Sequence, residues 1–515
     1  MLLITSLSHA QTGKFRYYFN TPVNSQLATA APATYLVSGF PDSIAAYINR
    51  AKYTVDIAMY NYTASAGSNV AKIAVAANNA AARGVRVRWL YNGTSGTANS
   101  GLSLLNAQIN KFAGPNWSSY IMHNKFMVID VNAPDSTDAW IQTGSFNFSD
   151  AQANGDVNNI IFIQSKQVAT AYYDEFNKMW GSTNAAPDAV NARFSTNKTA
   201  SSKTRFLVDD TWVEVYFSPK DGNGSKVQDI INQGNDELFF GVYTFTDNTI
   251  ATLLKNKYNA GIRVRGIMDE FSTSYTAYST LLPVLGNDLQ VHTGSDLYHD
   301  KVLIADAGNP ASDPTVITGS FNWTGQAQTS NDENTLIIHN SQVANAYYQA
   351  ICQNFTNLGG FACVAPPCIG KDIALVTSVR GSSYQWQVNT GTGFTNISDG
   401  ANYTGATTAN LLIKNSVSSW YGYQFRCWVN QQNYSDTTTL RFVAYWNGQT
   451  STNWHQASNW NCGVIPDSAT DVIINPGVKF FPQINQQATC RSVRLSKGAT
   501  ATLLSGIQLL LTGSN

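Results

Sequence analysis

The sequence predicts a multidomain protein in which a duplicated α/β body of two lobes is followed by two all-β modules. A chain of 515 residues is too long for a single core. Strand and helix patterns recur in the same order in residues 30–182 and 205–358, which indicates a duplication. Short alternating strands then predict a β-sandwich over residues 369–443 and a small β module over residues 444–515.

The first repeat begins with a predicted helix, because Asp42 and Ser43 are favourable N-caps before an apolar stretch. Residues 53–60 alternate between apolar and polar side chains and predict a strand. The Ala-rich residues 70–83 have helical spacing, and residues 85–90 predict the next strand. This order favours a parallel or mixed sheet that helices cover.

The second repeat has the same order, with a strand at residues 238–243, a helix at 248–260 and a strand at 261–267. Ser145 and Ser320 occupy equivalent positions, 175 residues apart. A unit of this size is too large for a solenoid repeat, so we expect two duplicated lobes that pack as a pair. Between them, residues 181–204 are rich in Asn, Ala, Ser and Thr and predict a linker.

The C-terminal modules are rich in tryptophan. Cys368, Trp386 and Cys427 follow one another in the order typical of an immunoglobulin-like sandwich, and this stretch resembles the Ig-like modules of secreted bacterial proteins. The last segment resembles small Trp-rich β modules of exported bacterial enzymes. Two interpretations of the tryptophans are open, a carbohydrate-binding face or the cores of the modules. The tryptophans are Trp386, Trp420, Trp428, Trp446, Trp454 and Trp460.

Charge and hydropathy limit the classes of protein. The chain has 32 acidic and 32 basic residues, so net charge gives no general attraction to nucleic acid or anionic membranes. No apolar run approaches the ~20 residues that span a bilayer. The apolar Leu2 to Ile4 and the small residues around Ala10 predict that residues 1–11 are a remnant signal peptide. We therefore expect a protein that a bacterium secretes or holds at its surface.

Cysteine use is in keeping with export, because all six cysteines lie at or after Cys352. No C-x-x-C pair indicates a zinc site, and we expect neither a metal nor another cofactor. In an exported protein the six cysteines are expected to form up to three disulfides, although spacing alone does not fix the pairing. The predicted pairs are Cys352–Cys363, Cys368–Cys427 and Cys462–Cys490.

One motif occurs once in each lobe, H-x-K-x4-D followed by G-S-F-N. Residues two apart on a strand share a face, so the His and Lys of each copy point the same way. One imidazole and one ammonium on one face, presented twice, suit a phosphodiester. The motif residues are His123, Lys125, Asp130, Ser145 and Asn147 in the first lobe, and His299, Lys301, Asp306, Ser320 and Asn322 in the second.

These paired motifs resemble those of the phospholipase D superfamily of phosphodiesterases, over roughly residues 30–358. The resemblance implies a metal-independent reaction in two steps. One histidine attacks phosphorus to form a phosphohistidine, and the other protonates the leaving alcohol and then activates water. It also implies that the lysines and asparagines grip the phosphoryl oxygens while the serines line the site. Because one chain carries both motifs, no dimer is needed to complete the site.

Three more residues, two of them in the motifs, have predicted supporting roles. Asp130 and Asp306 lie seven residues past each histidine, on the opposite strand face, and are expected to tie loops together. Glu333 in the second lobe corresponds to Asn158 in the first. A neighbouring carboxylate raises the pKa of a histidine. We therefore predict that Glu333 pairs with His299 and makes it the acid, which leaves the other histidine as the nucleophile.

Three functions follow as alternatives. The first is a secreted phospholipase D that hydrolyses the head-group phosphodiester of a phospholipid. The second is a nuclease of the Nuc type, which resembles the smaller bacterial members of the superfamily. The third is a non-catalytic adhesion protein in which the C-terminal modules bind a surface or a glycan. Intact motifs in both lobes favour an enzyme.

Two groups of side chains near the motifs have a functional and an ordinary interpretation. Aromatic residues could contact lipid, or they could pack in the core. Arginines that alternate on strands could form a basic face for nucleic acid, or solvated strand edges. The aromatic residues are Trp117, Phe148, Tyr298 and Trp323, and the arginines are Arg86, Arg88, Arg263 and Arg265.

Overall fold

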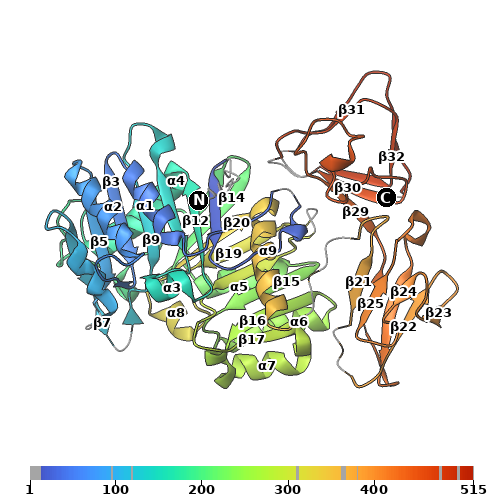
Figure 1. Cartoon of the computed structure of the whole chain (residues 1–515). Helices are drawn as coiled ribbons and strands as arrows, with labels where there is room; N and C mark the ends of the chain where they lie inside the picture. The colour runs from blue at the N-terminus through green and yellow to red at the C-terminus, as the bar shows by residue number, and fades with distance from the viewer. Residues whose placement is uncertain are drawn as a thin grey trace, which may run out of the picture.

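The computed structural model places a two-lobed α/β body beside two smaller β modules (Figure 1). It describes residues 13–513 apart from residues 30, 94–96, 118–119, 309–311, 361–362, 364–366, 378, 380, 436, 475–477 and 496–498. The predicted signal-peptide remnant, residues 1–11, lies outside the described residues.

The described residues of the first lobe form an eight-stranded sheet in the order β2-β1-β12-β10-β9-β3-β5-β6. The central strands β3, β9 and β10 are buried along their whole length, as expected of strands that helices cover on both faces. The strands are β1 (Phe15–Phe19), β2 (Thr34–Tyr35), β3 (Thr54–Met59), β5 (Arg86–Asn92), β6 (Asn110–Gly114), β9 (Lys125–Ile129), β10 (Trp140–Gly144) and β12 (Asn159–Gln164).

The second lobe repeats this sheet in the order β13-β14-β20-β19-β18-β15-β16-β17. From β14 to β17 each strand matches its counterpart from β1 to β6, which confirms the predicted duplication. The outer strands differ, because β2 runs parallel to β1 whereas β13 runs antiparallel to β14. The strands are β13 (Arg205–Val208), β14 (Thr211–Phe217), β15 (Glu237–Val242), β16 (Arg263–Asp269), β17 (Leu289–His292), β18 (Lys301–Ala305), β19 (Thr315–Gly319) and β20 (Asn334–His339).

Two sequence-based boundaries are wrong. The first lobe begins before residue 30, because β1 pairs with β12 along its length and belongs to the sheet. The first helix, α1 (Phe40–Arg50), starts before the predicted N-cap, since Pro41 is well tolerated in a first helical turn.

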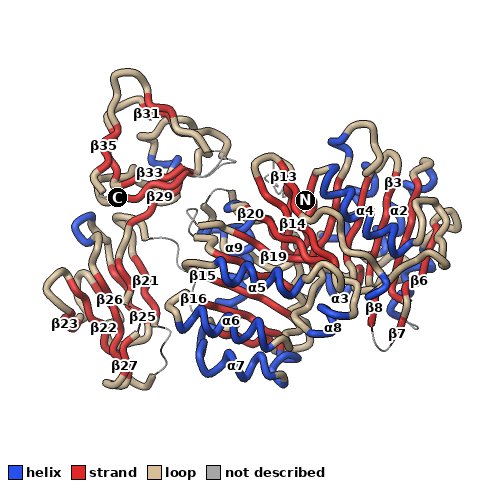
Figure 2. The backbone as a smooth tube through the Cα atoms, turned by 180° about the vertical axis from the view of Figure 1, so that it is seen from behind, coloured by secondary structure: helices blue, strands red, loops and turns tan. Residues whose placement is uncertain are grey.

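The helices form layers outside and between the two sheets (Figures 1 and 2). Helices α1 and α2 (Ala71–Ala82) cover the first sheet, and α5 (Asn223–Gln233), α6 (Asn248–Asn259) and α7 (Thr276–Leu285) cover the second. Helices α4 (Lys166–Trp180) and α9 (Ser341–Asn357) lie between the sheets. Helix α4 contacts β9 and β14, and α9 contacts β18 and β1, so each reaches both lobes. One apolar core therefore joins the lobes.

The first of the two β modules, predicted as a sandwich, has two small sheets. They enclose a core in which Trp386 and Cys427 are buried. This arrangement agrees with the predicted sandwich, whereas its Ig-like topology stays a prediction. The strands are β21 (Ile373–Val376), β24 (Tyr403–Thr404) and β25 (Asn410–Ile413) in one sheet, and β22 (Tyr384–Asn389), β23 (Phe394–Asn396), β26 (Gln424–Val429), β27 (Asn433–Tyr434) and β28 (Thr438–Thr439) in the other.

The last module consists of short parallel strands that stack on one another. The strands are β29 (Phe442–Trp446), β30 (Thr470–Ile474), β31 (Gln483–Ile484), β32 (Ala488–Cys490), β33 (Ser492–Leu495), β34 (Thr502–Leu503) and β35 (Leu509–Leu511). Trp446, Trp454 and Trp460 fill its core, so together with Trp386 most of the C-terminal tryptophans are core residues. The partly exposed Trp420 and Trp428 stack on tyrosines, and a glycan-binding face stays a prediction.

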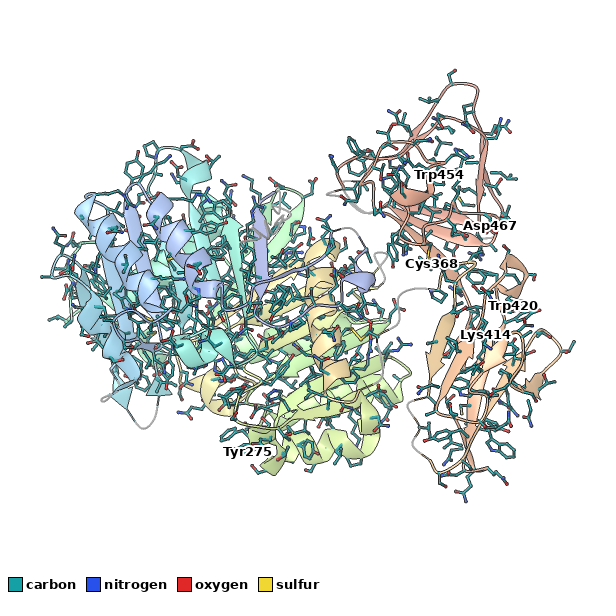
Figure 3. The ribbon with its side chains drawn as sticks, in the orientation of Figure 1. Tyr275, Cys368, Lys414, Trp420, Trp454 and Asp467 are labelled. Carbon is teal, nitrogen blue, oxygen red and sulfur yellow. A yellow bond between two sulfur atoms is a disulfide. The ribbon has the colours of Figure 1, made fainter. Side chains whose placement is uncertain are left out.

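The disulfide prediction is correct for one pair and wrong for two. Cys352 bonds to Cys363 as predicted, but Cys368 bonds to Cys462 rather than to Cys427. Cys368 lies at the junction of the β modules (Figure 3), where it meets the last module instead of the sandwich core. Within the described residues Cys427 and Cys490 are buried free thiols.

Among the described residues, no helix combines the length and the apolar character needed to cross a membrane.

Candidate active site

The two motif histidines lie just before equivalent strands, His123 before β9 and His299 before β18, and each is bound to the opposite lobe. The backbone N–H of His123 donates to the carbonyl oxygen of Asp332 at 2.9 Å. The N–H of His299 donates to the carbonyl oxygen of Val157 at 3.0 Å. Bridges between Met122 and Asp332 and between Val157 and Tyr298 extend these contacts. The loop that follows each G-S-F-N segment thus clasps the histidine of the other lobe.

Glu333 pairs with His123, across the lobe boundary. Its Oε2 lies 2.7 Å from Nδ1 of His123, and Ser320 Oγ donates to the same oxygen at 2.7 Å. The carboxylate is fully buried. The predicted pairing of Glu333 with His299 is therefore wrong, because the loop carrying Glu333 crosses to the other lobe.

His299 pairs instead with the amide of Asn158, whose Oδ1 lies 3.1 Å from Nδ1 of the ring. The Nδ2 of Asn158 donates to the carbonyl oxygens of Gln152 and Asp156, at 3.3 and 3.1 Å, which fixes the orientation of the amide. An amide oxygen only accepts hydrogen bonds, so Nδ1 of His299 carries the hydrogen and leaves Nε2 available for chemistry.

The motif serines form hydrogen bonds with the partners of the two histidines, Ser320 with Glu333 and Ser145 with Asn158. Ser145 Oγ lies 3.0 Å from Asn158 Oδ1 and 2.8 Å from Oδ1 of Asp300. Asn159 Nδ2 also donates to Asp300 at 2.7 Å, and burial raises the pKa of this carboxyl to about 6. Asp300 was not predicted as a site residue. Its equivalent in the first lobe is Asn124, so the two copies differ here as well.

The two lysines are buried and form no direct ion pair with a described residue. Lys125 and Lys301 are at most 2% exposed, and no carboxylate among the described residues lies within ion-pair distance of either ammonium. Each Nζ donates to the carbonyl oxygen of its own motif histidine, at 3.1 and 2.5 Å, and lies about 5 Å from the ring of Tyr60 or Tyr243. Burial lowers the pKa of Lys301 to about 7 and that of Lys125 well below its usual value. An anion in the site would restore both charges.

Burial also keeps both imidazoles neutral. It lowers the pKa of His123 to about 4, although Glu333 opposes the shift and Lys125 and Lys301 add to it. Burial and the two lysines lower the pKa of His299 well below its usual value. His123 itself contributes to the shift at His299. The two histidines and two lysines therefore form one electrostatically coupled cluster.

The G-S-F-N segments present two amides. The Oδ1 atoms of Asn147 and Asn322 are buried with no hydrogen-bond partner among the described residues. Gly144 and Gly319 precede the serines with φ of +143° and +133°, and a Cβ there would lie 2.2 and 2.4 Å from carbonyl oxygens of β12 and β20. The segment therefore requires glycine at its first position. The two amide oxygens are therefore not used by the described part of the fold.

Two tyrosines that were not predicted contact the histidines. The rings of Tyr60 and His123 lie 4.7 Å apart, and those of Tyr243 and His299 lie 5.1 Å apart. Each tyrosine directly follows the strand that pairs with its motif strand, β3 or β15. This equivalent position was the signal that could have identified them.

An aromatic series continues from Tyr243 to the surface of the second lobe. Tyr243 stacks on Phe271 at 5.8 Å, and Phe271 contacts Tyr275 at 5.8 Å. Phe271 is 50% exposed and Tyr275 is 37% exposed. Tyr275 lies at the lower edge of the second lobe in Figure 3. An exposed apolar surface thus leads to His299.

Asp130 and Asp306 have the predicted structural role. Asp130 accepts hydrogen bonds from the backbone N–H groups of residues 52–54, and Asp306 accepts from those of residues 235–237. Both adopt positive φ at the end of their strand. They tie a loop to the strand and lie outside the site.

Most of the other predicted side chains that are described have structural roles. Phe148, Tyr298 and Trp323 are core residues, and the side chain of Trp117 lies outside the described residues. Two of the arginines form buried ion pairs rather than a basic face or a solvated edge. They are Arg88, which binds Asp56 at 2.5 Å, and Arg265, which binds Glu237.

The inter-lobe linker also reaches the site, through Lys198. Its buried ammonium forms ion pairs with Glu175 of α4 and with Oδ1 of Asp332, the latter at 2.7 Å. Asp332 directly precedes Glu333, and its carbonyl oxygen binds the backbone of His123. Lys198 thus fastens the loop that supplies the carboxylate partner of His123.

Two family models match parts of this chain. A family model described as "Cardiolipin synthase, PLD-like domain" matches residues 44–180 and again residues 227–355. A second model, described as a domain of unknown function, matches residues 445–514.

Two curated relatives match a smaller part of this chain than the PLD-like family model does. The phospholipase D of Rickettsia conorii is 30% identical over 139 residues, 27% of this chain and 66% of that protein. The mitochondrial cardiolipin hydrolase of Chlamydomonas reinhardtii is 27% identical over 128 residues, 24% of this chain and 54% of that protein. Each match spans less than two thirds of the relative's own length.

Among solved structures, Nuc from Salmonella typhimurium, a phospholipase D family member, is 28% identical. That match covers 29% of this chain and 95% of that chain, with a TM-score of 0.26.

The PLD-like domain model accounts for a segment of each lobe, and the two segments together make up just over half of the chain. The protein therefore belongs to the phospholipase D-like family.

Proposed function

We propose that the protein is an exported phosphodiesterase that hydrolyses the head-group phosphodiester of a phospholipid through a phosphohistidine intermediate, without a metal ion. The observation that carries this proposal is the buried cluster of two histidines and two lysines from opposite lobes. Each histidine is oriented through Nδ1, by Glu333 or by Asn158. Glu333 and Asp300 favour the charged forms of the lysines without forming ion pairs with them, and a phosphodiester anion in the site would be a direct partner for both ammonium groups.

The reaction divides between the two rings. In the first step Nε2 of His123 attacks phosphorus, an N–P bond forms and the P–O bond to the leaving alcohol breaks. His299 enters this step as an imidazolium with a hydrogen on both ring nitrogens, because the bound anion raises its pKa, and the alcohol takes the proton from Nε2. In the second step His299 takes a proton from water, the water oxygen bonds to phosphorus and the N–P bond breaks. Lys125 and Lys301 hold the phosphoryl oxygens, and binding of the anion raises their pKa values so that both are charged.

The roles of the histidines rest on their partners. A phosphorylated imidazole that keeps its Nδ1 hydrogen is a cation, and the carboxylate of Glu333 at 2.7 Å stabilises that charge in the intermediate. His299 must give up its proton in the first step. The neutral amide of Asn158 fixes its tautomer without holding the proton. His123 therefore suits the nucleophile and His299 the acid, for a different reason from the one the sequence suggested.

A lipid substrate is supported by the surface beside His299. Phe271 and Tyr275 are exposed and lead from the surface to Tyr243. Aromatic residues with one apolar face suit the boundary of a lipid surface. Two of the four arginines that could have formed a basic face for nucleic acid are buried in ion pairs. The two disulfides support an exported protein, because such bonds persist in oxidising compartments.

The intermediate can be trapped to test the mechanism. Acid-sensitive phosphoryl label from a phosphorus-labelled substrate should map to the peptide that contains His123. His299→Asn lacks both the acid of the first step and the group that activates water, so label should accumulate in this variant when the labelled diester has a leaving group such as p-nitrophenol that departs without an acid. Label on the His299 peptide would reverse the two roles, and the absence of any label under rapid quench would refute the covalent mechanism.

The substrate class is tested with phosphatidylcholine vesicles and DNA side by side, each with and without EDTA. Lipid turnover that survives EDTA and is lost in His123→Asn supports the proposal. The matched control is His455→Asn in the last module, which should keep full activity. Cleavage of DNA alone would establish a nuclease instead.

The lipid-facing surface is tested with a soluble chromogenic phosphodiester beside the vesicles. Phe271→Ala with Tyr275→Ala should lower turnover of vesicles several-fold and leave turnover of the soluble diester unchanged. Trp212→Ala is the control, because Trp212 is similarly exposed but pairs with His339 at the other end of β20. Equal losses on both substrates would refute an interfacial role.

A further inference from the structure

Three buried positions near the motif histidines carry an amide in one half-site and a carboxylate in the other. The His123 half-site is the set of residues around His123, and the His299 half-site is the set around His299. The members of each pair occupy equivalent places in the two repeats, and all six residues are at most 7% exposed. The His299 half-site has the carboxylate in every pair, and we refer to these residues as the three aspartates. The pairs are Asn92 and Asp269 at the ends of β5 and β16, Asn124 and Asp300 between the motif His and Lys, and Asn331 and Asp156, eleven residues past Ser320 and Ser145.

At two of these positions the hydrogen bonds of the fold do not require a charge. In both half-sites the side-chain oxygen accepts a hydrogen bond from the backbone N–H of an equivalent residue just before the motif histidine. An amide oxygen makes this bond as a carboxylate oxygen does, so the negative charge in the His299 half-site is an additional feature. The bonds run from Tyr298 to Asp269 at 2.8 Å and from Met122 to Asn92 at 3.0 Å, and from Leu297 to Asp156 at 2.8 Å and from Ile121 to Asn331 at 3.2 Å.

The third carboxylate, Asp300, is held at the boundary between the lobes. Its Oδ1 accepts hydrogen bonds from the Ser145 hydroxyl at 2.8 Å and from the Asn159 amide at 2.7 Å, and both donors belong to the first lobe. The Oδ1 of its counterpart Asn124 has no hydrogen-bond partner among the described residues. Donors from the other lobe therefore fix the charge of Asp300 in place, and the His123 half-site has no equivalent of it.

The group on which the three aspartates act is the ammonium of Lys301. Burial lowers the pKa of Lys301, and all three aspartates oppose this shift, as Glu333 also does. Burial also lowers the pKa of Lys125, where Glu333 opposes the shift and Lys301 adds to it. In the described part of the chain none of the three aspartates forms an ion pair with a lysine or an arginine. The other titratable groups around Lys301 are Lys125, His123, His299 and Tyr243, whose ring lies 5.1 Å from the ammonium, and His292 lies 3.9 Å from Asp269.

We propose that the three aspartates are positioning residues that keep the Lys301 ammonium charged in the empty site, so that Lys301 binds the phosphodiester first and Lys125 gains its charge as the anion arrives. A buried ammonium needs negative charge nearby, because burial alone favours its neutral form. A direct ion pair would occupy the N–H donors that the substrate needs. Carboxylates that are bonded elsewhere stabilise the charge from a distance, and they leave Lys301 with a single hydrogen bond, to the carbonyl oxygen of His299. The inference rests on the proposed function only in requiring that the site bind a phosphodiester anion.

The test is calorimetry of the full chain with dimethyl phosphate, from about pH 5 to about pH 9. The variant combines Asp156→Asn, Asp269→Asn and Asp300→Asn. In wild type the affinity should fall above about pH 7, where Lys301 loses its charge. In the triple variant this fall should begin at least about one pH unit lower, because three charges that favour the ammonium are gone. Burial raises the pKa of Asp300 to about 6, so wild type also loses that charge at lower pH, and the two proteins should bind more alike near pH 5.

Proton uptake separates this role from a merely structural one. Calorimetry in buffers with different heats of ionisation gives the number of protons taken up with each bound anion. Because the pKa of Lys301 is about 7 in wild type, about half of the molecules already have this ammonium charged at pH 7. The triple variant should therefore take up more protons at pH 7 than wild type. A loss of structure would weaken binding equally at every pH and leave the proton uptake unchanged.

The matched control is Asp306→Asn, which makes the same chemical change outside the site. Asp306 also accepts backbone N–H groups, those of residues 235–237, and asparagine tolerates its positive φ. This variant should keep the pH dependence of wild type. If the triple variant fails to fold, Asp300→Asn alone should give the largest shift of the single variants, because Asp300 has the largest effect of the three on Lys301.

Three results would overturn the inference. The first is a pH dependence that neither the triple nor the single variants shift. The second is tighter binding by the triple variant at pH 7, which would show that the carboxylates mainly repel the anion. The third is a loss seen with the zwitterion glycerophosphocholine and not with dimethyl phosphate, which would mean that the aspartates bind a cationic part of the substrate. If wild type bound no dimethyl phosphate, the proposed function would fail as well, whereas an unshifted variant contradicts this inference alone.

Discussion

Replacing Lys198 by methionine removes the cation that two buried carboxylates share. Glu175 and Asp332 have side chains that are at most 1% exposed, and both bind the Lys198 ammonium. Breaking a buried ion pair by removing one partner costs about 3–5 kcal/mol. Burial already raises the pKa of Asp332 to about 6 against the opposing effect of Lys198. Without that cation Asp332 takes up a proton at neutral pH. Because the carboxyl is then uncharged, the loss of stability stays within about 3–5 kcal/mol.

The same change should lower activity, because Asp332 anchors the loop that carries Glu333. We expect a lower free energy of unfolding of the catalytic body in urea, followed by tryptophan fluorescence. We also expect kcat to fall in the fraction that remains folded. Lys198→Arg keeps the positive charge, so it should recover part of the free energy of unfolding and part of kcat.

The matched control is Lys178→Met. Lys178 binds the same Glu175 at 3.2 Å, but its side chain is 21% exposed. A partly exposed pair contributes about 0–1 kcal/mol. If Lys198→Met costs no more than Lys178→Met, the linker does not hold the site in place and the reasoning is wrong.

Three further predictions concern pH and covalent links. Although burial lowers it, hydrogen bonds to two carboxylates raise the pKa of His339 from 6.5 to about 9. Its contribution to stability should be present below about pH 6.5 and lost as pH rises through about 9, and urea unfolding of His339→Gln should lack this change. Burial lowers the pKa of Lys301 to about 7, so calorimetry should find that dimethyl phosphate, which stays a monoanion in this range, binds at least about tenfold more weakly per pH unit above 7, and a flat profile would contradict it. Cys368→Ser with Cys462→Ser opens a link across 94 residues and should destabilise the β modules by up to about 4.7 kcal/mol while leaving diester hydrolysis unchanged.

The duplication could be predicted from the sequence, because the periodicity of a strand or a helix depends on residues that are close together in the chain. The same order of strands and helices was therefore visible in both halves. The equivalence of Asn158 and Glu333 was also visible as an offset between the two repeats. Which histidine each one contacts was not visible, since that depends on loops that cross between lobes. The equal spacing from the motif serine gives the position of each residue within its own repeat. It does not show which residue of the other repeat it contacts.

Some residues were missed because their surroundings hide their role. Lys198 lies in a polar linker, where a lone lysine is usually solvated, and its burial follows from the way the lobes pack. Cys368 was assigned to the sandwich because of its place in the sequence order, although it lies at the junction with the last module. β1 is short and precedes a polar stretch, so its place in the sheet depends on pairing with β12, more than a hundred residues later.

The exchange of loops between lobes has a consequence for the symmetry of the site. In a symmetric dimer of identical chains, both histidines would necessarily receive the same partner from the opposite subunit. Here one histidine receives a carboxylate and the other an amide. A single chain removes this constraint, because its two copies differ in sequence, as Glu333 and Asn158 do. Each histidine can therefore have the partner that suits its own step.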